Sequence, residues 1–300
     1  MPDFKLITSV IKGAVTFIPG ANYFLNKKKK KTRHSGSDSV FSYSLWLSNL
    51  VYLTEHKIQP DYSRLVEIGN GGSLGIAFCA LMTGTKKYFS FEYKENIAFQ
   101  EQIELLEQIA LLFDKSEPIH FYEKINIRIS DNSFPADRVL PQMQRTQLLK
   151  QLKQDLQNKL VGSDLIVLVN NWEIQKPLNI TFAFSRAVME HVSDPNYIYQ
   201  SIYSHMATGA VMLHDIEFHS HGITKTITGH TQVAPWLWHI IVGRRPFYLN
   251  RLKMSDHTRC MVENGFSINI SKELYVAENE KFSIGGVVVA EKIMFVNDNT

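Results

Sequence analysis

The sequence predicts an α/β fold: a doubly wound, mostly parallel sheet of seven strands in which the final strand is antiparallel. Three observations lead to this expectation. Strand-like apolar runs alternate with helical patterns from residue 63 to residue 217, which is typical of a parallel sheet covered by helices. A glycine-rich turn, residues 69–75, follows the first strand. The last two strands, 266–274 and 286–295, have no helix between them and must therefore pair antiparallel.

The individual elements are predicted from their residue patterns. Continuous apolar runs of four to eight residues indicate buried strands, and apolar residues at helical spacing indicate helices. Segments 113–141 and 224–253 are treated as insertions. In chain order we expect helix 41–57, a strand ending at Ile68, a helix from about Ser73, strand 88–92, helices 94–112 and 142–160, strands 164–169 and 180–185, a helix from Pro195 to Gly209, strand 210–217, helix 255–264 and the final strand pair.

Length and composition favour one large domain with additions. The chain has 300 residues, of which 44% are hydrophobic and 20% charged, so a full core is expected and global disorder is not. The net charge is +3, and the five lysines at 27–31 exceed it, so we expect no nucleic-acid-binding surface elsewhere. Cys79 and Cys260 lie far apart without metal-ligand spacing, which favours thiols in a reducing compartment, the cytoplasm.

The first 40 residues are predicted to be an amphipathic helix and a basic linker ahead of the main domain, 41–300. Pro19-Gly20 ends the helix, and no apolar run nears the roughly 20 residues of a membrane span. Two interpretations stay open: a helix packed on the core beside a solvated lysine loop, which we favour, or peripheral contact of residues 1–34 with an anionic membrane, at its inner face. The apolar face consists of Phe4, Ile7, Ile11, Val15 and Ile18.

The glycine-rich turn predicts a nucleotide-like cofactor. Glycines let the backbone turn tightly and approach a ligand, and the helix that follows presents backbone N–H groups. A dinucleotide pattern that starts at Gly69 and Gly71 needs its third glycine at 74, where the chain has Leu74, so a nicotinamide cofactor is disfavoured. The alternative is a simple turn without a ligand. The candidate cofactor-binding residues of this turn are Glu67, Gly69, Asn70, Gly71, Gly72 and Ser73.

Two polar residues after neighbouring strands extend the cofactor site. Glu92 ends the second strand about 20 residues beyond the turn, where an acid commonly accepts hydrogen bonds from ribose hydroxyls. Asn171 follows strand 164–169, at a position that suits an adenine edge, because an amide both donates and accepts. Each is equally explained as a helix cap or a polar loop residue.

Several segments resemble a known family. Ser42–Leu47, Glu67–Gly75 and Met189–Pro195 resemble class I S-adenosylmethionine-dependent methyltransferases. His214–Gly222 and Asn250–Phe266 resemble the subgroup found among bacterial surface-polysaccharide biosynthesis enzymes. The similarity spans about residues 40–270. It implies a Rossmann-like sheet, S-adenosyl-L-methionine as cofactor, methyl transfer to an oxygen of a saccharide or related small molecule, and a cofactor-side position for Glu190.

The chain departs from related enzymes at two positions. Enzymes that hold a metal carry Glu-x-x-Glu-His, but the first position here is Ala187, so we predict no metal. Ser220 replaces the second acid of the subgroup's Ile-Asp-x-x-Asp-His segment. Any role of that acid in the subgroup is therefore not expected in this chain. The alternative of a metal bound by the three histidines between His214 and His221 stays open, since His219 and His221 can share a face.

Methyl transfer from a sulfonium requires alignment of the acceptor oxygen and removal of its proton. His221 is the predicted base because imidazole titrates near neutrality, and Glu217 is expected to orient it. His191 is the second choice. A solvated loop histidine is the alternative for each.

Insertion 224–253 carries aromatic and guanidinium groups that suit sugar rings, pyrophosphate or carboxylates. We expect acceptor binding there; the alternative is that its tryptophans pack a lid helix. The candidate residues are Trp236, Trp238, Arg244 and Arg251.

Competing functions are a nicotinamide-dependent oxidoreductase, a non-catalytic membrane-associated scaffold of the same fold, and an RNA methyltransferase that uses the lysine run. The glycine spacing and the terminal strand pair disfavour the first.

Overall fold

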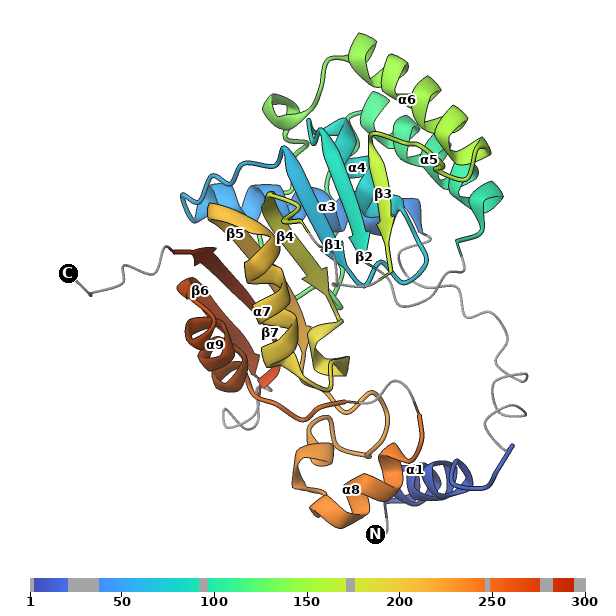
Figure 1. The fold of residues 1–300 in the computed structure, drawn as a ribbon, viewed down its shortest axis with the longest axis vertical. Coiled ribbons are helices and arrows are strands. Elements are labelled where there is room, and N and C mark those ends of the chain that lie inside the picture. The colour runs from blue at the N-terminus through green and yellow to red at the C-terminus, as the bar shows by residue number, and fades with distance from the viewer. Residues whose placement is uncertain are drawn as a thin grey trace, which may run out of the picture.

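A seven-stranded mixed sheet forms the centre of the computed structural model, which describes residues 3–20, 38–91, 97–170, 176–245, 249–275 and 283–293. The strand order is β3-β2-β1-β4-β5-β7-β6 (Figure 1). Strands β1 to β5 are parallel, whereas β7 is antiparallel to both β5 and β6. The strands are β1 (Arg64–Ile68), β2 (Lys87–Phe91), β3 (Ile166–Val169), β4 (Ile180–Arg186), β5 (Met206–Glu217), β6 (Phe266–Tyr275) and β7 (Ser283–Lys292).

This order confirms the predicted Rossmann-like fold. A doubly wound sheet has the order 3-2-1-4-5-6, and here the antiparallel β7 lies between β5 and β6. The strand order reverses between β1 and β4: strands β2 and β3 are added on one side of β1, and β4 pairs with its other side. Ligands of such sheets bind outside the carboxyl ends of the strands at this reversal. The site is therefore expected where β1 and β4 end.

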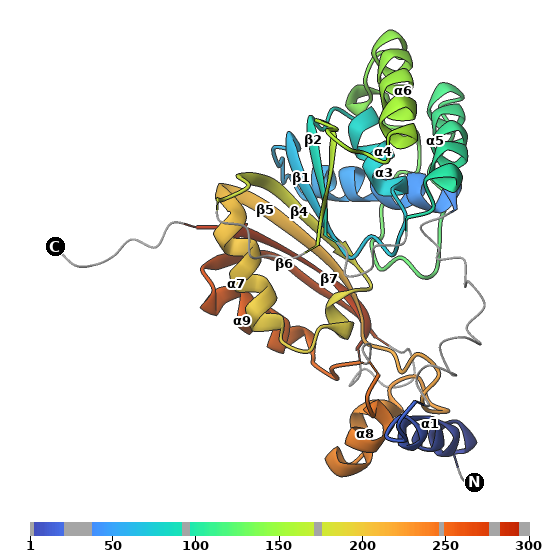
Figure 2. The ribbon, with the colours of Figure 1, turned by 45° about the vertical axis from the view of Figure 1, so that its right-hand side comes forward.

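Helices cover both faces of the sheet (Figures 1 and 2). Side chains alternate along each strand, so that Leu65 packs under one set of helices and Val66 under the other. The first set is α3 (Ser39–Glu55), α4 (Gly75–Met82), α5 (Phe99–Asp114) and α6 (Gln142–Gln157), and the second is α7 (Pro195–His205) and α9 (Met254–Glu263).

The helix predicted from Pro195 to Gly209 is shorter than expected. Asp194 caps it by accepting a hydrogen bond from the Tyr197 backbone N–H at 3.1 Å, but α7 ends at His205. Strand β5 begins at Met206, and its pairing with β4 shifts register before Val211. Gly209, with φ +75°, lies in that irregular stretch, so this glycine supports a bulge in a strand rather than a helix end.

A small lobe lies below the sheet in Figures 1 and 2 and joins two segments far apart in sequence. Helix α1 (Phe4–Val15) packs against α8 (Pro235–Val242) of insertion 224–253. A Cβ atom on Gly13 would lie 2.1 Å from the carbonyl oxygen of Ile240, so the two backbones touch. The amino-terminal helix and insertion 224–253 therefore form one unit rather than separate additions.

Helix α1 does not use its predicted apolar face for this contact. Leu6 and Val10 pack against the lobe's small core instead. The exposed fractions of Phe4, Ile7 and Ile11 are 73%, 46% and 58%. The prediction that this face packs on the core of the domain is therefore wrong. Among the described helices none is long and apolar enough to span a membrane.

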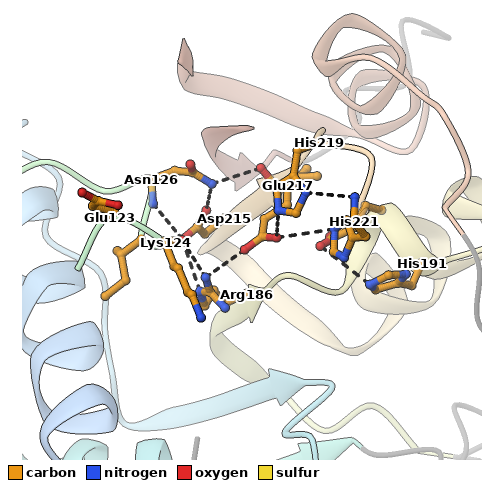
Figure 3. Close-up of polar contacts among 12 residues, drawn as sticks. Glu123, Lys124, Asn126, Arg186, His191, Asp215, Glu217, His219 and His221 are labelled. Carbon is orange, nitrogen blue, oxygen red and sulfur yellow. Dashed lines mark hydrogen bonds and ion pairs between the residues drawn. The ribbon is translucent and has the colours of Figure 1, made fainter. Parts of the chain in front are cut away.

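Insertion 113–141 contributes to the site. Helix α5 extends to Asp114, and after it the chain runs past the ends of β4 and β5 (Figure 3). Ile125 and Ile127 anchor this stretch in the core. Between them, Asn126 donates hydrogen bonds to the carboxylate of Asp215 from its side-chain amide and, at 3.3 Å, from its backbone N–H.

Candidate functional site

The glycine-rich turn lies at the carboxyl end of the central strand β1. Gly69, Gly71 and Gly72 have φ values of +75°, +62° and +82°, a left-handed conformation that glycine adopts without strain. The side-chain oxygen of Asn70 accepts a hydrogen bond from the Gly72 backbone N–H at 2.7 Å and closes the turn. Ser73 and Leu74 then lead into α4, which begins at Gly75, two residues later than predicted.

Gly69 also allows a close approach between two loops. A Cβ atom there would lie 2.5 Å from a methyl carbon of Val188, which follows β4. The turn after β1 and the segment after β4 are therefore in direct contact at the point where the strand order reverses. Val188 is only two residues from Glu190, so the predicted cofactor turn adjoins the polar groups described below.

Glu67, a predicted cofactor contact, lies on β1 and bonds to the neighbouring strand. Its side chain is 6% exposed and accepts a hydrogen bond from the hydroxyl of Tyr88 on β2. Burial, together with the nearby Glu67 carboxylate, raises the pKa of Tyr88 well above its usual value, so the phenol remains a donor. Glu67 therefore ties β1 to β2 and stands behind the turn. Glu92 and Asn171 lie outside the described residues.

A network of charged side chains spans the ends of β4 and β5 (Figure 3). Arg186, the last residue of β4, donates to Glu217 at 2.9 Å and lies 3.9 Å from Asp215. It also donates to the backbone carbonyl of Lys124 at 2.6 Å. Asp215 and Glu217 alternate along β5 with Ile216 between them, so both carboxylates lie on the side of the sheet that carries α3. One guanidinium thus interacts with two carboxylates at the carboxyl-terminal ends of β4 and β5.

These two carboxyl groups differ in their titration. Burial raises the pKa of Asp215 to about 6, although Arg186 and Asn126 oppose this shift. For Glu217, burial alone would raise the pKa, but a hydrogen bond from His219 and the charge of Arg186 outweigh burial and lower it. Both carboxyl groups are therefore mostly ionised at pH 7, and Glu217 stays ionised to a lower pH than Asp215.

Two histidines contact Glu217, and a third, His191, lies beyond them against His221 (Figure 3). The Nε2 atoms of His219 and His221 lie 2.7 Å and 3.4 Å from the same Glu217 oxygen. Their rings stack with centroids 4.1 Å apart, and the ring of His191 meets that of His221 edge-on at 5.1 Å. The structure thus brings together the predicted base, its predicted carboxylate and the second-choice base.

His221 is neutral in this environment. Burial, together with the neighbouring His219, lowers its pKa to about 4, although Glu217 acts in the opposite direction. Its φ of +47° places it in the left-handed region, directly before Gly222. A neutral imidazole at pH 7 can accept a proton or bind a metal ion.

Glu190, for which the resemblance implied a position beside the cofactor, lies in the cluster. It is 3% exposed, and within the described part of the chain neither of its carboxylate oxygens has a hydrogen-bond partner. His191 Nε2 lies 4.0 Å away. Burial raises the pKa of Glu190 well above its usual value, and the charges of Glu217 and Asp215 add to this effect. Glu190 therefore faces the histidines, and among the described residues nothing donates a hydrogen bond to its side chain.

Asn250 fixes the backbone that carries Glu190 and His191. Its amide donates to the carbonyls of Met189 and Val192 at 2.7 Å and 3.0 Å, and its backbone N–H donates to the carbonyl of Glu190 at 2.8 Å. The chain leaving the small lobe thus holds the short helix η3 (Met189–His191) in place.

The four predicted acceptor-binding residues do not form one surface. Trp238 is buried in the lobe, and the guanidinium of Arg251 stacks on its ring at 4.9 Å. Arg244 lies over the ring of Phe17 of the amino-terminal segment at 5.7 Å. Trp236 is 68% exposed. Trp238, Arg251 and Arg244 are therefore occupied in packing, as in the lid-helix alternative, and Trp236 is the one with a largely free side chain.

Sequence reasoning missed Arg186, Asn126 and His230. Arg186 carried a signal, because it is a charge directly after an apolar strand. Asn126 carried none. His230, of helix η4 (Gly229–Gln232), lies 6.1 Å from Trp238 between ring centroids and interacts electrostatically with His219, so it connects the lobe to the cluster.

Comparisons with known proteins found only remote structural similarity. No family model and no curated protein matches the sequence. A SAM-dependent methyltransferase of Methanosarcina mazei is 15% identical, with a TM-score of 0.42 over 81% of this chain and 97% of that one. One from Mesorhizobium loti is 11% identical, with a TM-score of 0.40 over 78% and 94%. Geranyl diphosphate methyltransferase, bound to GPP and sinefungin, is 9% identical, with a TM-score of 0.45 over 82% and 78%. Similarity this remote carries no information on the activity of this chain.

Proposed function

We propose that this chain is an S-adenosyl-L-methionine-dependent methyltransferase of the class I fold that methylates an oxygen of a saccharide or related small molecule. The observation that carries the proposal is the contact between the left-handed glycine turn after β1 and Val188 after β4. It joins a nucleoside-binding type of turn to the carboxylate and histidine cluster at the point of the sheet where ligands bind. The sequence resemblance supports the choice of cofactor and acceptor.

The residues of the turn fit this cofactor. Gly71 is exposed and Gly72 half-buried in the turn between β1 and α4, so neither residue has a side chain that would keep a ligand from the backbone. Glu92 and Asn171 are the proposed ribose and adenine contacts. The cofactor would supply a methyl group on a sulfonium sulfur. The sequence-based assignment of the protein to the cytoplasm belongs to the same proposal.

The cluster would provide the proton transfer. The neutral imidazole of His221 takes the proton of the acceptor hydroxyl, and Glu217 stabilises the imidazolium that forms. The bound cofactor would supply the methyl carbon to the deprotonated acceptor oxygen and would retain the carbon–sulfur electron pair on its sulfur. Arg186 keeps Glu217 ionised during this step. His191 lies beside His221 and is the second proton acceptor in reach of the same position.

A thermal-shift titration tests the proposal against its alternatives. S-adenosylmethionine and S-adenosylhomocysteine are expected to raise the melting temperature with increasing concentration, whereas NAD is not. A shift with NAD alone would indicate the oxidoreductase, and no shift with any of the three would indicate the non-catalytic scaffold. RNA affinity that falls steeply with salt would favour an RNA substrate.

We further propose that α1 contacts an anionic membrane surface. Phe4, Ile7 and Ile11 are exposed, and the sequence places five lysines shortly after this helix. The wild type is expected to sediment with vesicles of phosphatidylserine and phosphatidylcholine at low salt, and I7E/I11E is expected to stay in solution. M143E, which changes a 72% exposed methionine on α6, should sediment like the wild type. Wild-type protein that stays in the supernatant would contradict this proposal.

A further inference from the structure

The histidine cluster contains two sets of side chains with the spacing of metal ligands. Glu190, His191 and His221 form one set, and Glu217, His219 and His221 form the other. Within each set the ligand atoms lie within 4.8 Å of one another. His221 belongs to both. Glu190 and His191 follow β4, Glu217 ends β5, and His219 and His221 follow β5; the two strands pair directly in the sheet.

Among the described residues, only one of these sets contains a carboxyl group that has no hydrogen-bond partner. Glu217 already contacts Arg186 at 2.9 Å and His219 at 2.7 Å. Glu190 is 97% buried, and no described residue gives either of its oxygens a hydrogen bond. A buried carboxylate without a partner is unfavourable by several kcal/mol or must take up a proton. A cation between Glu190 and the two imidazoles would remove this penalty without breaking an existing contact of Glu190.

We propose that Glu190, His191 and His221 bind a divalent transition-metal ion, of the Zn²⁺, Mn²⁺, Fe²⁺ or Co²⁺ type. Two imidazoles and one carboxylate are the donors that these ions prefer, whereas Mg²⁺ and Ca²⁺ select sites built of oxygen. Glu217 orients the imidazoles of His219 and His221 at the edge of the site. The sequence analysis predicted no metal because Ala187 replaces the first carboxylate of the pattern. In this proposal the imidazole of His221 takes the place of that ligand.

Three protein ligands leave coordination positions open for an acceptor hydroxyl. A hydroxyl bound to such a cation loses its proton more easily, as water does on zinc. This role rests on the proposed methyl transfer. With a metal bound, His221 acts as a ligand, the proton leaves to solvent, and the cation stabilises the oxygen that attacks the methyl carbon. Metal binding itself does not depend on the cofactor, so the two proposals can fail separately.

Metal titration of tag-free, EDTA-treated full-length protein tests the site in the absence of cofactor. By calorimetry with Zn²⁺, and by the visible absorption of Co²⁺, the wild type is expected to bind one equivalent per chain, with Mg²⁺ far weaker. E190Q and H191Q are expected to weaken Zn²⁺ affinity by at least about 30-fold. The matched control is H120Q, because His120 is exposed and pairs with Glu117 at 3.9 Å outside the cluster.

The folded state of the variants can be checked independently. E190Q replaces a buried carboxyl group that has no hydrogen-bond partner among the described residues, so its metal-free melting temperature is expected to equal or exceed that of the wild type. Three results would each overturn the site. They are stoichiometric Zn²⁺ binding by E190Q and H191Q with wild-type affinity, tighter binding of Mg²⁺ than of Zn²⁺, and no metal binding by the wild type. Zn²⁺ binding together with methyl transfer that survives EDTA would overturn the role of the metal in the reaction.

Discussion

His221→Ala is expected to slow methyl transfer by about a hundredfold or more while the affinity for S-adenosylmethionine stays nearly unchanged. Its Nε2 atom lies 3.4 Å from Glu217, and its ring centroid lies 5.1 Å from that of His191. Its loss removes a proton acceptor or a metal ligand but leaves the glycine turn intact. The measurement is the transfer of labelled methyl groups to cell-surface glycan precursors, with cofactor affinity from calorimetry.

The pH profile adds a second readout for His221. Burial and His219 lower its pKa to about 4, so the imidazole is neutral above that pH and charged below it. The active, neutral form of His221 should therefore persist as the pH falls from 7 to 5, so titration of His221 is expected to cause no drop of kcat/KM near pH 6.5. His120→Ala, at an exposed histidine outside the cluster, serves as the control. Wild-type turnover by His221→Ala would refute the assignment.

Gly69→Ala is expected to weaken cofactor binding by about 30-fold or more, or about 2 kcal/mol. The added Cβ would lie 2.5 Å from a methyl of Val188, whose branched side chain has little freedom to move, and φ at this position is +75°. The turn and the segment after β4 must then separate, which moves the backbone that would hold the cofactor. Calorimetric titration with S-adenosylhomocysteine measures the change.

Gly162→Ala is the matched control for this substitution. Gly162 has φ +73°, but a Cβ atom there meets nothing within 4 Å. Both variants carry the strain of a left-handed alanine, of order 1 kcal/mol, so both should melt at a lower temperature than the wild type. Only Gly69→Ala should lose affinity. Equal affinities in the two variants would show that the turn is not the binding element.

Local sequence patterns predicted the sheet and the turn because strands, glycine turns and the missing final crossover helix are local features. The grouping of His191, Glu217 and His221 was also predictable, since the carboxyl ends of parallel strands share one edge of the sheet. Arg186 was not placed in the site, because its partners Asp215 and Glu217 lie 29 and 31 residues away and only the sheet pairing brings them together.

Residues outside the alternating core were predicted less well. The apolar spacing of α1 identified a helix, but Gly13 and its close contact with α8 decide which face is buried. Trp238 and Arg251 were predicted as acceptor contacts from their chemistry, and they stack on each other instead. In both cases the partner is distant in sequence, so composition indicates what a side chain can bind but not what occupies it.

The most direct test of the central claim is calorimetric titration of the purified wild-type chain with S-adenosylmethionine and S-adenosylhomocysteine. The account predicts saturable binding of both at one site per chain, and loss of affinity in Gly69→Ala but not in Gly162→Ala. No heat of binding for either compound, with the protein folded as judged by its melting transition, would contradict it.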